Sequence, residues 1–537
     1  MNLPSTASPR FSDRTEALLV TIAAALLYFA LQGELPYHDA QRFADQTSSG
    51  HFVWDIAHIL LQPSAMLVHQ VFHSDPITTL KTLSSLFTAI AIGVFYLLLL
   101  RLRLPRWQVT LGTILLAGSC SVLTLAPSAH PKLMAFPFVN GALLMLCVAE
   151  SRQLLTRKIL VTAGVLLALG GAFLASVLAT VPFAVLAVLF AARRYGATWA
   201  DALKKSILIC MACGLTFLFI VCAGYMVFTG EALSTAGLTG SVTGKAELRP
   251  ASIPIAVHLA RAVFGTINNL VTVPELGATV QAWMRGQIPT LQPYARLLPI
   301  FLLWISAGLL VAAVYLRTFV SLVRGKCLFV PIAFLVGAQV WTLWYGLNDP
   351  EHWFQLTGPT IILFLMTMPK VVVRLGLPTW AAAATLANFA LLAIPVANYS
   401  VTRYSAELTG MVGPKDLLVT FAHYPGRPYP GFLDLKSLHS LPVDLRLEES
   451  GAVADVVLPR IDSELAETLQ GGGRVFVADI LDPLDWEAPW MSLLGRGVTK
   501  KKLEQSILHD RIAKRLADVG GIKIWQLQQN PAAVARQ

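Results

Sequence analysis

The sequence predicts an α-helical membrane protein that crosses the bilayer many times and carries a small α/β domain at its C-terminal end. Hydrophobic residues make up 55% of the 537 residues and charged residues only 13%, whereas a soluble domain carries roughly 25% charged residues. Apolar runs long enough to cross about 30 Å of hydrocarbon recur up to about residue 400. From residue 401 onward the charge density rises and these long runs stop.

Eleven apolar segments are therefore predicted to be transmembrane helices within a membrane domain of residues 1–400. The fifth and sixth segments are separated only by Thr180, Val181 and Pro182, and the sixth is short. The predicted spans cover residues 17–33, 80–100, 107–126, 134–149, 159–178, 179–192, 207–228, 297–316, 327–346, 356–371 and 379–398.

Lysine and arginine residues predict how the spans are oriented. They cluster at every second connection, and short cytoplasmic loops are enriched in such residues. The pattern predicts an odd number of spans, a cytoplasmic N-terminus and a periplasmic C-terminal domain. Spans rich in small residues and basic inner loops suit a bacterial inner membrane. It also explains most of the net charge of +10 without a nucleic-acid partner. The clusters are Arg10/Arg14, Arg101/Arg103/Arg106, Arg152/Arg157/Lys158, Arg193/Arg194/Lys204/Lys205, Arg317/Arg324/Lys326 and Lys370/Arg374.

The first outer loop, residues 34–79, is the most informative part of the chain. It contains five of the eleven histidines and four aspartates. Ionisable groups gathered at one face of a many-span protein are typical of catalysis or transport. Asp39 follows the first span almost directly. A carboxylate in that place can act as a general base at the membrane surface, or it can simply cap the start of a helix.

Residues 54–71 of this loop repeat apolar residues at helical spacing, with a break near Pro63, and predict interfacial helices. Asp55 and His58 share a helical face because they stand three positions apart. His69 and His73 stand four positions apart, a spacing that suits a metal ion. The alternative is that these two histidines face lipid headgroups.

Three further outer regions carry candidate binding residues. His130 and Lys132 lie between prolines after the third span, where a cation can receive a phosphate or merely sit at the interface. The outer loop at residues 229–296 contains a predicted amphipathic helix, and its cations Arg249 and Arg261 can bind an anionic lipid headgroup or a lipid-linked phosphate. Ordinary surface charge on a long loop explains them equally well.

The last outer region precedes the tenth span. Asp349, Glu351 and His352 stand there beside aromatic residues that include Trp353. Aromatic rings stack on the faces of sugars and carboxylates bind their hydroxyls, although tryptophan is also common at any membrane interface.

This layout resembles the GT-C class of membrane glycosyltransferases, which includes protein O-mannosyltransferases, oligosaccharyltransferases, lipid A aminoarabinose transferases and GPI mannosyltransferases. The resemblance rests on an early acid and interfacial helices in the first outer loop, and on a later outer loop that leads into a span with Pro359. The sequence departs from the class in two places. Ala40 stands where a second acid is usual, and His130 and Lys132 replace an acid after the third span. The matching stretches are residues 38–43, 54–63 and 348–354.

The resemblance implies a GT-C-like fold and an enzyme that moves a sugar from a polyprenyl-phosphate donor to an envelope glycan, lipid or protein acceptor on the outer face of the membrane. Asp39 is then the catalytic base. The cofactor is undefined, and a divalent metal ion is one option. The implied substrate-binding residues are His38, Arg42, Asp55, His58, His130, Lys132, Arg249, Arg261, Glu351, His352 and Trp353.

Two other functions fit parts of the sequence. The absent second acid favours a non-catalytic scaffold or partner subunit of an envelope polysaccharide system. A transporter would carry ionisable or broken-helix sites near the middle of the bilayer, but the predicted spans contain almost no interior charge.

Residues 401–537 are predicted to form a layered α/β domain outside the membrane. Strands are expected within residues 412–425 and 471–481, and the glycines at 471–473 are expected to form a turn. Residues 454–470 are interpreted as a strand, a turn and a helix. Residues 501–521 are interpreted as one helix and residues 522–528 as a closing strand.

Overall fold

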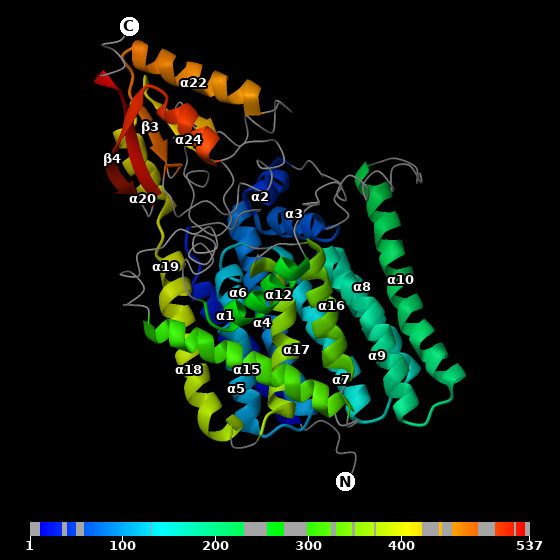
Figure 1. Ribbon diagram of the computed structural model, residues 1–537. Helices are drawn as coiled ribbons and strands as arrows, with labels where there is room; N and C mark the ends of the chain where they lie inside the picture. The colour runs from blue at the N-terminus through cyan, green and yellow to red at the C-terminus, as the bar shows by residue number, and fades with distance from the viewer. Residues whose placement is uncertain are drawn as a thin grey trace. The chain divides into compact units, whose positions relative to one another are not determined.

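The computed structural model of the protein forms two compact units (Figure 1). Unit 1 comprises residues 1–32, 39–273 and 294–396, and unit 2 comprises residues 33–38, 274–293 and 397–537. The structure describes residues 11–34, 40–49, 58–129, 131–229, 255–272, 298–323, 329–345, 350–369, 372–420, 440–442, 454–478, 480–481, 500–519 and 522–531.

Unit 1 is helical throughout its described residues, because its long apolar runs satisfy their backbone hydrogen bonds internally. Its α-helices are α1 (Phe11–Ala30), α2 (Ala40–Ser49), α3 (Leu61–Phe72), α4 (Pro76–Arg101), α5 (Arg106–Ala117), α6 (Cys120–Leu125), α7 (Phe136–Ser151), α8 (Arg157–Phe173), α9 (Val181–Arg194), α10 (Trp199–Thr229), α12 (Ile255–Leu270), α15 (Leu298–Val323), α16 (Phe329–Tyr345), α17 (Pro350–Thr367), α18 (Leu377–Asn388) and α19 (Ile394–Ala397). The 3₁₀ helices η1 (Pro131–Ala135) and η2 (Ala175–Thr180) and the π-helices η3 (Val372–Gly376) and η4 (Phe389–Ala393) connect them.

Each of the eleven predicted segments contains helix. Within the described part of the chain, six helical stretches are long and apolar enough to cross a membrane, which supports a multi-pass membrane protein. Two shorter apolar helices lie at Phe329–Trp341 and Trp353–Thr367. The six stretches are Pro76–Arg101, Lys132–Ser151, Ala175–Arg194, Trp199–Val227, Leu298–Val323 and Leu377–Ala397.

Two predicted spans are broken. Residues 159–178 contain the end of α8 at Phe173 and most of η2, which are separated by the extended Leu174. Residues 107–126 form α5 and α6, and the chain turns between them at Gly118 and Ser119. The side chain of Asn388, which is fully buried, closes this break. Its Nδ2 donates to the carbonyl oxygens of Gly118 and Leu270, each at 2.9 Å, and its Oδ1 accepts a hydrogen bond from the N–H of Thr272 at 3.1 Å. Backbone groups freed by a break inside a membrane domain need such partners.

Glycines allow several helices of unit 1 to approach closely, as is common in membrane domains. A Cβ atom on Gly93 of α4 would lie 3.0 Å from the carbonyl oxygen of Ala17 in α1. One on Gly164 of α8 would lie 2.8 Å from both the Cβ of Ala212 and the carbonyl oxygen of Ile209 in α10. Any larger residue would therefore push these helix pairs apart.

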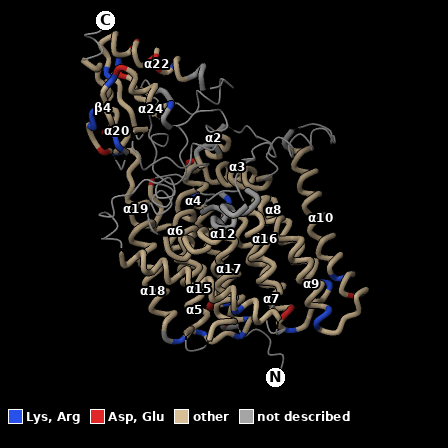
Figure 2. Tube along the Cα trace, viewed as in Figure 1, with Lys and Arg blue, Asp and Glu red and all other residues tan. Residues whose placement is uncertain are grey.

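The basic clusters of unit 1 gather at one end of its helices. Figure 2 shows blue segments where α4 is joined to α5 and where α9 is joined to α10. Arg101 interacts electrostatically with Arg14 and Arg152, which belong to two other clusters. Nearby, the buried carboxylate of Glu150 accepts hydrogen bonds from the N–H groups of Phe329 (2.6 Å) and Val330 (3.0 Å) and so caps the start of α16. We refer to this end as the basic face.

Unit 2 contains a five-stranded mixed sheet in the order β2-β1-β3-β5-β4. β2 and β3 pair parallel with β1, whereas β5 pairs antiparallel with β3 and β4. Helices α22 and α24 pack on one face of the sheet and α20 packs on the other (Figure 1). The elements are α20 (Val401–Met411), β1 (Leu417–Thr420), β2 (Ser440–Pro442), α22 (Ala454–Gln470), β3 (Val475–Ala478), α24 (Lys500–Leu508), β4 (Arg511–Val519) and β5 (Ile522–Gln529).

Two predictions for unit 2 were wrong. Residues 454–470 form the single helix α22, which contains Pro459. The predicted helix at 501–521 ends at Leu508, and β4 follows because it pairs along its length with β5. The predicted turn at the three glycines is confirmed, with Gly472 at a φ of 77°.

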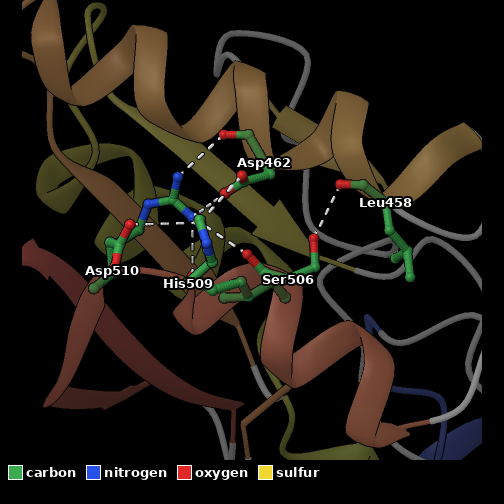
Figure 3. A network of polar contacts seen from close by, with 7 residues as sticks. Leu458, Asp462, Ser506, His509 and Asp510 are labelled. Carbon is green, nitrogen blue, oxygen red and sulfur yellow. Dashed lines mark hydrogen bonds and ion pairs between the residues drawn. The ribbon is translucent and has the colours of Figure 1, made fainter. Parts of the chain in front are cut away.

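Arg511 fixes the chain reversal between α24 and β4, where Asp510 has a positive φ of 53°. The Arg511 side chain is only 6% exposed and lies 2.7 Å from the carboxylate of Asp462 in α22. It also donates to the carbonyl oxygens of Ser506 and Ile507, which end α24. Figure 3 shows this network, in which His509 lies 3.5 Å from Asp462 while the hydroxyl of Ser506 donates to Leu458. This network holds α22, α24 and β4 together. The Ser506 hydroxyl bonds to Leu458 and the His509 ring lies beside Asp462, so the serine and the histidine do not contact each other as a catalytic pair would.

Candidate functional site

The polar end of unit 1 is built around the first outer loop. Interfacial helices with a break near Pro63 were predicted for residues 54–71. The helix α3 begins at Leu61, so Pro63 lies in its first turn, where the missing N–H is not needed. Just before α3, the His58 side chain is buried, and its Nδ1 lies 3.1 Å from the carbonyl oxygen of Phe173 at the end of α8. The ring of Phe43 in α2 packs edge-on against His58 at 5.5 Å. His58 thus joins α2 and the start of α3 to the membrane helices.

Three phenylalanine rings form a cluster at Phe173, the residue whose carbonyl oxygen contacts His58. The rings of Phe138 in α7 and Phe173 in α8 stack at 5.5 Å with an interplanar angle of 12°. The ring of Phe87 in α4 lies 5.7 Å from Phe173 and 6.2 Å from Phe138. The apolar interior of the bundle therefore begins directly below the polar end.

Two buried lysines stand at the same end of the bundle. Lys81 in the second turn of α4 is 8% exposed, and Lys132 in η1 is 7% exposed. The elements that carry them pack together, and Ser85 of α4 donates to the carbonyl oxygen of Ala126 at 3.1 Å, just ahead of η1. Lys81 precedes Arg101 by twenty residues of continuous helix, which spans about 30 Å at 1.5 Å per residue. The lysines therefore lie about one hydrocarbon thickness from the basic face.

The loop that leads to Lys132 is strained. Ala129 is fully buried and has a positive φ of 61°. A residue with a Cβ atom rarely adopts this conformation, and such strain is often found at functional sites.

The start of α17 packs into the same region of unit 1. Phe354 meets Phe136, the first residue of α7, at 5.1 Å, and Gln355 donates to the hydroxyl of Ser176 in η2 at 2.7 Å. Trp353 is 4% exposed, and its indole N–H finds no hydrogen-bond partner among the described residues. A Cβ on Gly265 of α12 would lie 2.5 Å from that nitrogen, so the indole lies directly on the helix backbone.

Asn269 of α12 fixes this start of α17. Its Oδ1 accepts a hydrogen bond from the N–H of Ser121 in α6 at 2.9 Å. Its Nδ2 donates to the carbonyl oxygen of Trp353 at 3.1 Å and also to the hydroxyl of Thr357. One buried side chain thus connects α12, α6 and α17, and so holds the helix turn that carries Glu351 and His352.

Three of the predicted site residues, His58, Lys132 and Trp353, have described side chains, and all three are buried at this end. Four others lie in described helices, but their side chains are outside the described set: Arg42, Arg261, Glu351 and His352. Five lie outside the described residues altogether: His38, Asp39, Asp55, His130 and Arg249.

The metal hypothesis for the first outer loop gains no support from the described residues. No group of three histidine, cysteine or acidic side chains among them is placed to hold an ion. His69 instead directs its Nδ1 to the carbonyl oxygen of Ser74 at 2.6 Å, and His73 ends α3 with a positive φ of 49°.

Chemically, this end of unit 1 offers two buried cations, a histidine and an indole N–H. Such groups can stabilise a negative charge that develops on an oxygen. The sequence analysis missed Lys81 and Asn269. A lone lysine five residues inside an otherwise apolar helix start was the available signal for Lys81.

No family model and no curated protein matches the sequence. ArnT from Cupriavidus metallidurans bound to undecaprenyl phosphate is 9% identical, with a TM-score of 0.42 over 95% of this chain and 98% of that one. Its apo state is 10% identical, with a TM-score of 0.40 over 97% and 99% of the two chains.

The protein O-mannosyltransferase Pmt1–Pmt2 complex of S. cerevisiae, bound to the sugar donor, is also similar. It is 15% identical, with a TM-score of 0.34 over 42% of this chain, and the chain matches 34% of that relative's length.

Proposed function

We propose that the protein is a GT-C-type glycosyltransferase that transfers a sugar from a polyprenyl-phosphate donor to an envelope glycan, lipid or protein acceptor. The observation that carries the proposal is the pair of buried lysines, Lys81 and Lys132, at the end of unit 1 farthest from the basic face, where His58 is also buried. By the positive-inside rule the basic face is cytoplasmic, so the lysines would face the periplasm.

In the proposed reaction the carboxylate of Asp39 takes a proton from the acceptor hydroxyl or amine. The acceptor then attacks the anomeric carbon, the bond from that carbon to the phosphate oxygen breaks, and polyprenyl phosphate leaves. Lys132 and Lys81 would stabilise the charge on the leaving phosphate, helped by Arg249 or Arg261. Asp55, Glu351 and His352 would bind sugar and acceptor, and Trp353, which is buried against α12, would position the helix turn that carries Glu351 and His352.

The test is transfer of labelled sugar from donors built on undecaprenyl phosphate, in membranes that contain the full chain. Lys132→Met should lower the transfer rate by about 10²–10³-fold, as loss of one charge-stabilising donor does. Asp39→Asn should lower it by about 10²–10⁴-fold. The matched controls Lys158→Met and Asp201→Asn change exposed residues and should leave the rate unchanged.

Two outcomes would count against the proposal. Transfer that survives Lys132→Met would remove the leaving-group role of the lysine. A folded wild-type protein that transfers no sugar from any donor would favour the non-catalytic scaffold, for which the alanine at position 40 was the sequence argument.

A further inference from the structure

An apolar groove opens on the outside of unit 1, at a distance from the lysine site. It has a volume of about 340 Å³, within the range of about 300–1,000 Å³ typical of ligand sites. Its walls come from α15, the end of α17, η3 and the start of α18. The lining residues are Ser306, Leu309, Leu310, Phe364, Val372, Gly376, Leu377 and Trp380.

The walls of the groove are almost entirely apolar. The single hydroxyl, on Ser306, accepts a hydrogen bond from the indole N–H of Trp380 at 2.8 Å and donates to the carbonyl oxygen of Leu303 at 2.6 Å. These polar atoms therefore satisfy one another. An apolar space of this kind does not hold water.

The groove opens toward the lipid. The adjacent outward face of α15 exposes Leu302 (56%), Ile305 (39%) and Leu309 (68%) in a helix that is long and apolar enough to span the membrane. In a bilayer the chains nearest to the opening are those of lipids, so an alkyl chain is the occupant that this chemistry fits.

A positive charge stands at the basic end of the groove. Phe364 lies three residues before α17 ends, and η3, which follows, places the exposed Arg374 between the lining residues Val372 and Gly376. Arg374 belongs to the last basic cluster of the sequence. Basic residues beside crevices between membrane helices bind anionic headgroups.

We propose that this groove binds the acyl chain of an anionic phospholipid from the leaflet at the basic face, with Arg374 facing its phosphate. The lipid site is independent of the proposed transfer reaction, because the groove lies toward the opposite end of α17 from Trp353.

Substitution of Gly376 can fill the groove without disturbing the surrounding structure. It lines the space, a Cβ atom there would meet nothing within 4 Å, and its φ of −93° and ψ of −38° suit any residue. Gly214 in α10 is the matched control, since it is exposed on a helix that faces lipid and its Cβ would also meet nothing within 4 Å. Gly376→Leu and Gly214→Leu therefore add the same side chain with and without a groove.

The experiment is native mass spectrometry of the full chain in detergent, titrated with phosphatidylglycerol and with phosphatidylcholine of the same acyl chains. Wild type should bind phosphatidylglycerol about fivefold more tightly, the effect expected of one cation near a lipid phosphate. Gly376→Leu should lose this binding and Gly214→Leu should keep it. Arg374→Gln should bind both lipids equally, whereas the exposed Arg157→Gln should behave as wild type.

Three results would overturn the proposal. Gly376→Leu that binds phosphatidylglycerol as wild type does would exclude the groove as the site. Equal binding of both phospholipids by wild type, a measurement that needs no variant to fold, would exclude selection of an anionic lipid. Undecaprenyl phosphate that occupies the Gly376-dependent site more tightly than phosphatidylglycerol would assign the groove to a different lipid.

Discussion

Replacement of Asp416 by alanine should loosen unit 2 strongly, because this carboxylate holds the start of β1 against β3. Only 7% of its side chain is exposed. It accepts hydrogen bonds from the backbone N–H groups of Gly413 and Arg474, each at 2.7 Å. The guanidinium of Arg474 adds bonds from Nε (3.1 Å) and Nη2 (2.7 Å). Leu417, the first residue of β1, then donates to the carbonyl oxygen of Arg474 at 2.9 Å.

The expected loss can be worked from these contacts. Each backbone bond to a buried carboxylate contributes at least about 1.5 kcal/mol. Because the Arg474 side chain is 52% exposed, solvent screens the ion pair, which adds about 1 kcal/mol at most. Asp416→Ala should therefore lower the free energy of unfolding of unit 2 by about 4 kcal/mol at pH 7.

The effect should depend on pH in a defined direction. Burial raises the pKa of the Asp416 carboxyl, but the hydrogen bonds from Arg474 and Gly413 outweigh burial and leave that pKa below its usual value. A group with a lowered pKa in the folded state stabilises the protein above the pKa of the unfolded chain, about 3.9. That stabilisation is lost as the pH falls through the folded pKa. The difference between wild type and Asp416→Ala should thus be complete at pH 7 and shrink below about pH 4.

The assay is hydrogen exchange of the full-length protein, followed in peptides from β1 and β3 at pH 7, with thermal unfolding between pH 7 and pH 3 beside it. About 4 kcal/mol corresponds to roughly 10³-fold faster exchange where unfolding of the unit controls it. Asp518→Ala is the control: its carboxylate is about half exposed and lies 3.7 Å from Arg515. Solvent screens the interactions of such an exposed carboxylate, so the change should cost under about 0.5 kcal/mol. Unchanged protection in Asp416→Ala, or an equal effect of both variants, would refute the reasoning.

Three further predictions concern unit 1 and are checked by thermal unfolding in detergent. Glu150→Ala removes both acceptors that cap α16 and should cost about 2–4 kcal/mol, whereas an unchanged midpoint would mean that water replaces the cap. Gly164→Val forces α8 and α10 apart and should cost about 1–3 kcal/mol, while Gly214→Val should cost much less because no neighbour stands within 4 Å. Ala129→Gly should stabilise the protein by up to about 1 kcal/mol by relieving the positive φ, and a loss of stability would show that the alanine methyl packs usefully.

Much of the fold of unit 1 could be predicted because its segments are apolar over whole helix lengths. The break at Gly118 could not, since the surrounding run has no proline and no charged residue and its partner Asn388 stands 270 residues away. In unit 2, residues 501–519 have helical periodicity across the point where α24 ends. Pairing of β4 with β5 overrode that local preference. Residues 454–470 were likewise interpreted as a strand, a turn and a helix, but they form the single helix α22, which continues through Pro459.

The sequence predicted which kinds of residue form the candidate site, but it did not identify all of the residues. The sequence analysis selected His58, Lys132 and Trp353 because polar and aromatic residues are conspicuous next to apolar spans, and the structure buries all three. Lys81 was counted as part of a span, since hydropathy does not distinguish a lysine that faces lipid from one that faces protein. Asn269 has no local signature, because its partners lie in α6 and α17, which are both far from it in the chain.

The way Asn388 closes the α5–α6 break has a consequence for biogenesis. The carbonyl group of Gly118 enters the membrane long before its partner, which is made 270 residues later. At about 5–20 residues per second, the ribosome needs roughly 14–54 s to supply it. Throughout that interval the carbonyl oxygen of Gly118, at the end of α5, lacks its native hydrogen-bond donor. A chain cut short after α17 never acquires the asparagine, and we expect membrane quality control to recognise that open helix end.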